Sequence, residues 1–124
     1  GNLDVTMTQV TANGNGGEGI DLEEDDDADG GGDLCVRFTG VTTSDNGGIA
    51  SAPGAKLEED GPGTLKATLV RHVASDNAEA GLSFDQQARD GDAPGEVTLV
   101  RLIAENNPDG PFVTDGAVNV TQRP

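Results

Sequence analysis

The chain has 124 residues, the length of one domain, yet it contains only three Phe and no Trp or Tyr. So few large apolar side chains cannot fill a compact globular core, whereas stacked repeats need fewer because each layer buries only against its neighbours. Asp and Glu number 23 against 7 Lys and Arg, which gives a formal charge of −16. This charge disfavours nucleic acid and anionic membranes as partners, since both are bound through cationic side chains. Two explanations of the charge remain: a solvated, salt-adapted surface, or carboxylates gathered to hold metal.

Asparagine recurs at a nearly fixed interval, and this interval predicts the architecture. Steps of 31, 31 and 30 residues separate four of them, which are Asn15, Asn46, Asn77 and Asn107. The same step of 31 residues separates Leu3, Leu34 and Leu65. A period in this range is typical of stacked-repeat proteins. The sequence therefore predicts one domain over 1–124, with repeats 3–33, 34–64, 65–95 and 96–124, either whole or as a fragment of a longer solenoid.

Each repeat begins with alternating apolar and polar residues. The apolar positions of the first three repeats are Leu3, Val5 and Met7, then Leu34, Val36 and Phe38, then Leu65, Ala67 and Leu69. Alternation with period two predicts a β-strand with one buried face. A further inward column is expected at Val10, Val41, His72 and Leu102. A column of small residues just before each asparagine then predicts a tight corner at Ala12, Thr43, Ala74 and Ala104.

A second short strand is expected after each corner. It is clearest at 20–22 and 82–84, and it is degenerate in the fourth repeat, around 110–113. The second repeat carries four extra residues, including Pro53, before its strand at 55–57, and its next loop is four residues shorter. Loops rich in Asp, Gly and Pro close the units, and these residues favour turns rather than helix. A final strand is expected at Val118 and Val120.

These columns predict an all-β fold, a right-handed parallel β-helix of about four coils. Consecutive coils would pair as parallel strands about 4.8 Å apart. The corner asparagines would then form an internal ladder, in which each amide donates to the carbonyl of the next. An antiparallel β-sandwich is the alternative, since short alternating strands with Gly and Pro turns look the same locally. We predict the β-helix because a sandwich has no reason to keep asparagine in register.

One recurring phrase carries a family resemblance. A valine, three residues, a glycine or aspartate, and an asparagine are followed by Gly-Ile-x-Leu, from Val10 to Leu22 and less closely from His72 to Phe84. With this phrase the chain resembles bacterial right-handed parallel β-helix proteins of the pectate-lyase-like superfamily. The resemblance covers most of the chain and implies the fold. In enzymes of that superfamily, an exposed Arg and an Asp-bound calcium on the flank of the helix carry the chemistry.

The first acidic loop is the most specific chemical signal. Asp25, Asp27 and Asp29 stand two residues apart and are followed by Gly30. Carboxylates with this spacing in a tight loop can converge on one hard cation, and the glycine permits the sharp turn. We therefore predict Ca²⁺ as a candidate ligand of these three aspartates, and Glu23, Glu24, Asp26 and Asp33 could add oxygens. The alternative is a solvated acidic loop without bound metal.

Other polar residues have simpler explanations. Arg71 and Arg101 fall in one column, but Asp45 and Asp76 nearby occupy corner positions and are better explained as turn formers. The only histidine, His72, falls in an inward column, so it is expected to be packed rather than catalytic. The only cysteine, Cys35, excludes an internal disulfide and is expected to point outward, where it would be inert or would crosslink two chains.

The functional expectation is a structural or ligand-binding module without enzymatic activity, on a secreted or surface bacterial protein, with calcium ordering its acidic loop. The alternative is a carbohydrate-active fragment, a polysaccharide lyase or glycosidase, which would use the same fold with an Asp- and Arg-lined groove. Carbohydrate is therefore a candidate partner. The first unit has no cap over its strand edges, so we also expect self-association through the N-terminal coil, or further coils upstream in the natural protein.

Overall fold

A computed structural model of the chain describes residues 1–25, 31–87 and 93–124. These residues form nine β-strands, and none of them is helical. The strands are β1 (Leu3–Thr8), β2 (Ile20–Glu24), β3 (Leu34–Thr39), β4 (Ala55–Glu59), β5 (Leu65–Val70), β6 (Leu82–Gln86), β7 (Gly95–Val100), β8 (Phe112–Gly116) and β9 (Val118–Arg123).

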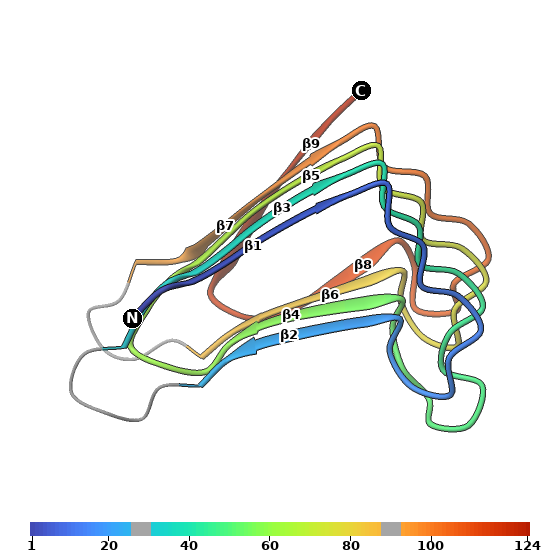
Figure 1. Cartoon of the computed structure of the whole chain (residues 1–124), viewed down its shortest axis with the longest axis horizontal. Helices are drawn as coiled ribbons and strands as arrows, with labels where there is room; N and C mark the ends of the chain where they lie inside the picture. The colour runs from blue at the N-terminus through green and yellow to red at the C-terminus, as the bar shows by residue number, and fades with distance from the viewer. Residues whose placement is uncertain (26–30, 88–92) are drawn as a thin grey trace.

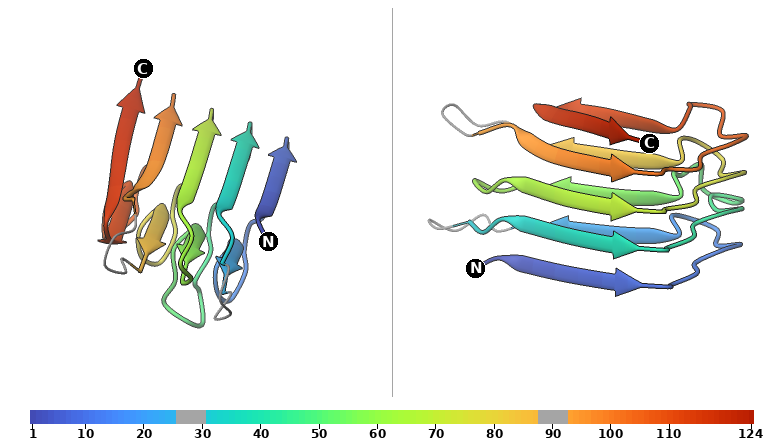
Figure 2. Two further views of the ribbon diagram at one scale, coloured as in Figure 1. Left: turned by 90° about the vertical axis from the view of Figure 1, so that its left-hand side faces the viewer. Right: turned by 90° about the horizontal axis from the view of Figure 1, so that it is seen from above.

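The chain alternates between two parallel sheets and so winds into a solenoid (Figure 1). The first sheet has the order β1-β3-β5-β7-β9 and the second has the order β2-β4-β6-β8. Every pairing is parallel, and the winding is right-handed (Figure 2). The predicted fold class is therefore confirmed, and the antiparallel sandwich is wrong. The solenoid makes about three turns, slightly fewer than the four coils expected.

The register of the sheets explains how unequal repeats keep one period. In the first sheet Leu3 pairs with Leu34, and Leu34 pairs with Leu65. In the second sheet Ile20 pairs with Ala55, an offset of 35 residues, whereas Ala55 pairs with Leu82, an offset of 27. The predicted extra residues of the second repeat thus lie in the segment that connects β3 to β4, and the shorter loop after β4 restores the register.

The core consists of the inward side chains of both sheets. Its largest fully buried apolar members are Phe38, Phe84, Leu34, Leu57, Leu65, Leu69, Leu82, Leu99 and Val41. Burial decreases towards the ends of the stack because a terminal coil has a neighbour on one side only. Val41 is 0% exposed, whereas Val10, the matching residue of the first coil, is 36% exposed. The predicted inward column is therefore correct, and its first member lies at an open end.

A third side of irregular chain joins the first sheet to the second. Single parallel bridges tie its coils together, between Thr11 and Thr42, Thr42 and Val73, and Val73 and Ile103. Two columns on this side have positive φ angles of 53–70°: Gln9, Gly40, Arg71 and Arg101 in one, and Gly14, Asp45, Asp76 and Asn106 in the other. Because every coil repeats both bends, this left-handed geometry belongs to the fold rather than to one site. Asp45 and Asp76 are turn formers, as predicted.

The predicted asparagine ladder occupies this side. Side-chain Nδ2 groups donate to the Oδ1 of the asparagine one coil on, from Asn15 to Asn46 at 2.9 Å, from Asn46 to Asn77 at 3.1 Å and from Asn77 to Asn107 at 3.0 Å. The backbone N–H groups of the same three donors reach the same oxygens. Asn46 and Asn77 are each 2% exposed. Each interior amide thus satisfies several buried polar groups that water cannot reach.

The ladder also holds the backbone of the preceding coil. Asn46 donates its second Nδ2 hydrogen to the carbonyl of Ala12 at 3.0 Å, and Asn77 donates to that of Thr43 at 3.0 Å. Asn107 donates to that of Ala74 at 2.7 Å. The small residues of the predicted tight corner therefore present their carbonyl groups to the ladder, and the coil cannot shift by one residue without breaking these bonds.

We predict that Asn46→Ala lowers the free energy of unfolding by about 1–3 kcal/mol, because it removes the bonds to the buried Asn77, to the partly buried carbonyl of Ala12 and to the exposed Asn15. Urea denaturation measures the change. The matched control is Asn119→Ala, which removes one exposed amide bond to Glu96 and should change stability by less than about 0.5 kcal/mol. Equal denaturation midpoints for the parent and Asn46→Ala would contradict a stabilising ladder.

Candidate functional site

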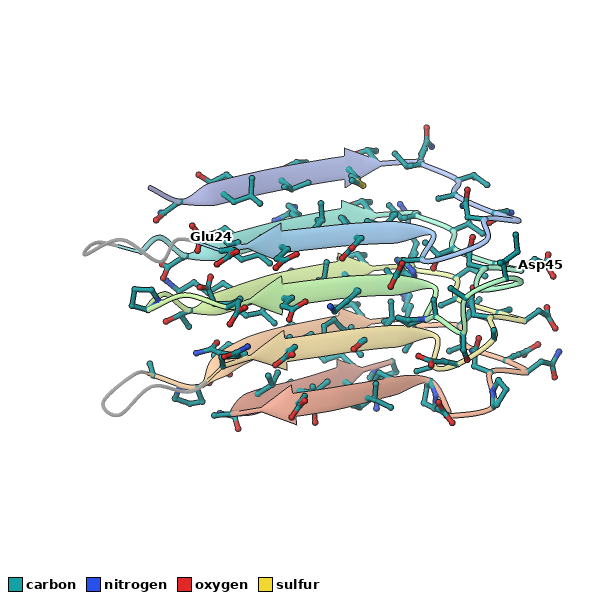
Figure 3. The ribbon with its side chains drawn as sticks, turned by 90° about the horizontal axis from the view of Figure 1, so that it is seen from below. Glu24 and Asp45 are labelled. Carbon is teal, nitrogen blue, oxygen red and sulfur yellow. The ribbon has the colours of Figure 1, made fainter. Side chains whose placement is uncertain are left out.

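A second polar column lies at the opposite end of the coil from the asparagine ladder. Figure 3 labels one residue of each region, Glu24 at the end of β2 and Asp45 on the third side. The last inward positions of β2, β4 and β6 are Glu24, Glu59 and Gln86, which stand next to one another in the sheet register. All three are buried, with 8%, 0% and 0% exposure. Polar side chains therefore line the interior at both ends of the second sheet.

Two members of this column tie the coil closed. Glu59 accepts the backbone N–H of Leu34 on Oε2 and that of Gly61 on Oε1, both at 3.0 Å. Gln86 accepts the N–H of Leu65 on Oε1 at 2.9 Å and donates from Nε2 to the carbonyl of Ala93 at 2.8 Å. Each side chain thus joins the end of a second-sheet strand to the start of the first-sheet strand in the same coil.

Glu24, the first member of the column, differs from the other two. Its Oε2 is buried and has no hydrogen-bond partner among the residues that the structure describes, although Glu24 lies directly beside Glu59 on the paired strand. Burial raises the pKa of the Glu59 carboxyl; the N–H groups of Gly61 and Leu34 oppose this rise, and the charge of Glu24 and a side-chain hydrogen bond with Glu24 add to it. Two acidic side chains are therefore buried side by side, and one of their oxygens has no donor among the described residues.

The sequence analysis missed this column, although the sequence contained the signal for it. Every second residue of a strand points inward, so Glu24 follows Ile20 and Leu22 on the inward face of β2. In the same way, Gln86 follows Leu82 and Phe84 on the inward face of β6. The acidic run after residue 22 was interpreted as loop, because carboxylates are seldom buried. The alternation of inward and outward residues along the strand would have predicted the burial of Glu24 correctly.

The predicted metal ligands are only partly within the described residues. Asp25 directly follows β2 and is exposed, whereas Asp27 and Asp29 lie outside the described ranges. Among the residues that are described, no group of three or more His, Cys, Asp or Glu side chains is arranged to hold a metal ion. Calcium binding by the three aspartates therefore stays a prediction.

The outer face of the second sheet is strongly acidic. Its strand register places four carboxylates in one column, which are Glu23, Glu58, Asp85 and Asp115. Lys56 forms an ion pair with Glu58 on this face. Burial raises the pKa of Asp85, and the neighbouring charges of Glu58 and Asp115 raise it further. Stacked like charges repel, so this face costs the fold stability that the buried columns must offset.

His72 is packed in the core, as predicted. It is 0% exposed, its Nε2 lies 3.0 Å from Thr43 Oγ1, and its ring stacks on Phe38 with centroids 6.0 Å apart. Its Nδ1 has no hydrogen-bond partner in the described part of the chain. Burial lowers the pKa of His72 from 6.5 to about 4, so the ring is neutral at pH 7.

The remaining candidate residues do not converge. Arg71 and Arg101 follow β5 and β7 at the left-handed bends, and no hydrogen bond or ion pair links either of them to Asp45 or Asp76 within the described residues. Cys35 alternates outward, as predicted, but it is only partly exposed. Burial raises the pKa of its thiol, and the neighbouring Asp4 raises it further.

No pocket is present in the described part of the molecule, and no described segment is a helix that could cross a membrane. No family model matches the chain, and no similar protein was found among curated proteins or solved structures. The candidate sites are therefore the buried pair Glu24 and Glu59 and the acidic outer face of the second sheet.

We predict that His72 makes the protein less stable as the pH falls from 7 to 4. The folded pKa is depressed, so in this window the unfolded chain binds a proton at His72 that the folded chain does not, and stability rises with pH. The loss attributable to His72 at pH 4 is about 3 kcal/mol. His72→Leu, which copies Leu102 in the same column, should lack this contribution. Urea denaturation at both pH values measures it, and parallel losses in parent and variant would contradict the assignment.

Proposed function

We propose that the protein is a non-enzymatic structural or ligand-binding module of a secreted or surface bacterial protein, related to the pectate-lyase-like β-helices. The observation that carries the proposal is the continuous stack, in which buried side chains at both ends of β4 and β6 bind backbone rather than converge on a substrate. Such a stack holds its two outer faces at a fixed separation. This favours a role as a spacer or as a platform for a ligand.

Calcium is the second part of the proposal. Asp25, Asp27 and Asp29 supply carboxylates at the spacing that a hard cation requires, directly after β2. The acidic outer face adds an electrostatic reason, because a divalent cation would relieve the repulsion within a chain of charge −16. Calcium bound at the loop would stabilise the folded chain by mass action.

The class of protein can be tested with an acidic polysaccharide. We predict that purified protein incubated with polygalacturonate and calcium releases no unsaturated products detectable by ultraviolet absorbance, whereas calcium raises the midpoint of thermal unfolding. The matched variant is the triple change Asp25→Asn, Asp27→Asn, Asp29→Asn, which should reduce the calcium-dependent rise. Product release by the parent would instead favour a polysaccharide lyase, and an unchanged rise in the triple variant would move calcium to another site.

Self-association through the first coil is also proposed. The inward residues of β1, which are Leu3, Val5 and Met7, are each only partly buried, and no described strand pairs with one edge of β1. An open strand edge beside apolar side chains favours pairing with another chain. The charge of −16 opposes association at low salt.

We therefore predict that sedimentation velocity at high protein concentration detects a dimer in 1 M NaCl, where a Debye length of about 3 Å screens the repulsion. The change Val5→Lys, on the inward face of β1, should reduce the dimer fraction. The change Thr6→Lys, on the outward face of the same strand, is the control and should leave it unchanged. A strictly monomeric parent would contradict the proposal.

A further inference from the structure

The buried pair Glu24 and Glu59 leaves one carboxyl oxygen without a donor among the described residues. The two residues are direct neighbours across β2 and β4, and both point into the interior. Glu59 has two backbone donors, whereas Oε2 of Glu24 is buried and no described residue donates to it. The next member of the column is the neutral Gln86. No positively charged side chain forms an ion pair with either carboxylate among the described residues.

An ionised carboxylate without a partner is costly to bury, and a second carboxylate beside it increases the cost. A cation bound between the two carboxylates would remove this cost. The third coil supports this explanation, because there the column position is an amide and needs no counter-charge. Within this inward column, the negative charge is confined to the first two coils.

We propose that Glu24 and Glu59 bind one divalent cation of the calcium type at this position. Carboxylate oxygens are the preferred ligands of such hard cations, and each oxygen has a second lone pair beyond the one used for an N–H. β2 is the edge strand of the second sheet, so the cation can approach from the open end of the stack. The two carboxylates supply only part of a coordination shell, and water and backbone carbonyls supply the rest.

This site deepens the proposed function, and it rests on that proposal only in taking calcium as the ion. Its two ligands come from the strands, on the inward face, and are distinct from the three aspartates of the following loop. Affinity in the range of extracellular calcium modules, about 10⁻⁴–10⁻³ M, is expected from two protein carboxylates.

The test is a calcium titration of the whole chain after treatment with EDTA, followed by thermal unfolding and calorimetry. Glu24→Gln is the informative variant because its amide can donate to Glu59 and so supplies the missing donor without a cation. Glu23→Gln is the matched control; it removes the same charge from the same strand, but on the exposed outer face. In 10 mM calcium the parent and Glu23→Gln should each gain at least about 4 °C in Tm. Glu24→Gln should lose most of this gain and start from a higher Tm in EDTA.

The loop variant Asp25→Asn, Asp27→Asn, Asp29→Asn separates the two calcium proposals. If it keeps the calcium response and Glu24→Gln loses it, the buried pair is the site and the loop proposal fails. If Glu24→Gln responds as the parent does, the inference is overturned. It is also overturned if calcium has no effect on the parent while Glu24→Gln is more stable at every calcium concentration, because a shared proton then neutralises the pair. Should Glu24→Gln fail to fold, Glu59→Gln replaces it, with the same outcomes.

Discussion

The structure depends on keeping equivalent backbone positions of successive coils directly above one another. The asparagine ladder enforces this constraint, since each interior amide contacts the coil before it and the coil after it. A slip of one residue would strand several buried polar groups at once and would also turn the inward leucines outward. This explains how a chain with so few large apolar side chains keeps one arrangement. The hydrogen bonds of the asparagine ladder on the third side, and those of Glu59 and Gln86 at the ends of β4 and β6, add to the stability that the limited apolar core provides.

The same stacking that forms the ladder also creates the main electrostatic cost of the molecule. Parallel strands in register place like residues beside like, which suits amides, because an amide both donates and accepts. It does not suit carboxylates, which only accept. The outer column of Glu23, Glu58, Asp85 and Asp115 tolerates this arrangement because water and salt screen it. The buried pair Glu24 and Glu59 has no such screening, and for this reason it is the most informative acidic position.

Much of the fold could be predicted from the sequence because repetition supplies its own alignment. The 31-residue step predicted the parallel register, the inward columns and the corner asparagines, and the four extra residues of the second repeat, including Pro53, were recognised. The left-handed bends at Arg71 and Arg101 could not be predicted, since arginine carries no preference for positive φ and only Gly40 marks the column. The buried glutamates were missed because the acidic composition of the segment was given more weight than the alternation of inward and outward residues along the strand. The candidate loop site could be named from spacing alone, whereas the inward carboxyl pair required strand pairing to be known.

The unequal offsets of the second sheet have a practical consequence. Between Asn46 and Gly54 the second coil accommodates four more residues than its neighbours, and the flanking strands still pair in register. Part of this insertion is held by backbone bonds from Ile49 and Ala50 to Gly16 of the coil below, while the Ile49 side chain is 94% exposed. The ladder therefore isolates this bend from the strands on either side. Foreign peptides grafted at that point would be displayed on a rigid support, and repeating the graft coil by coil would space them at the rise of the stack.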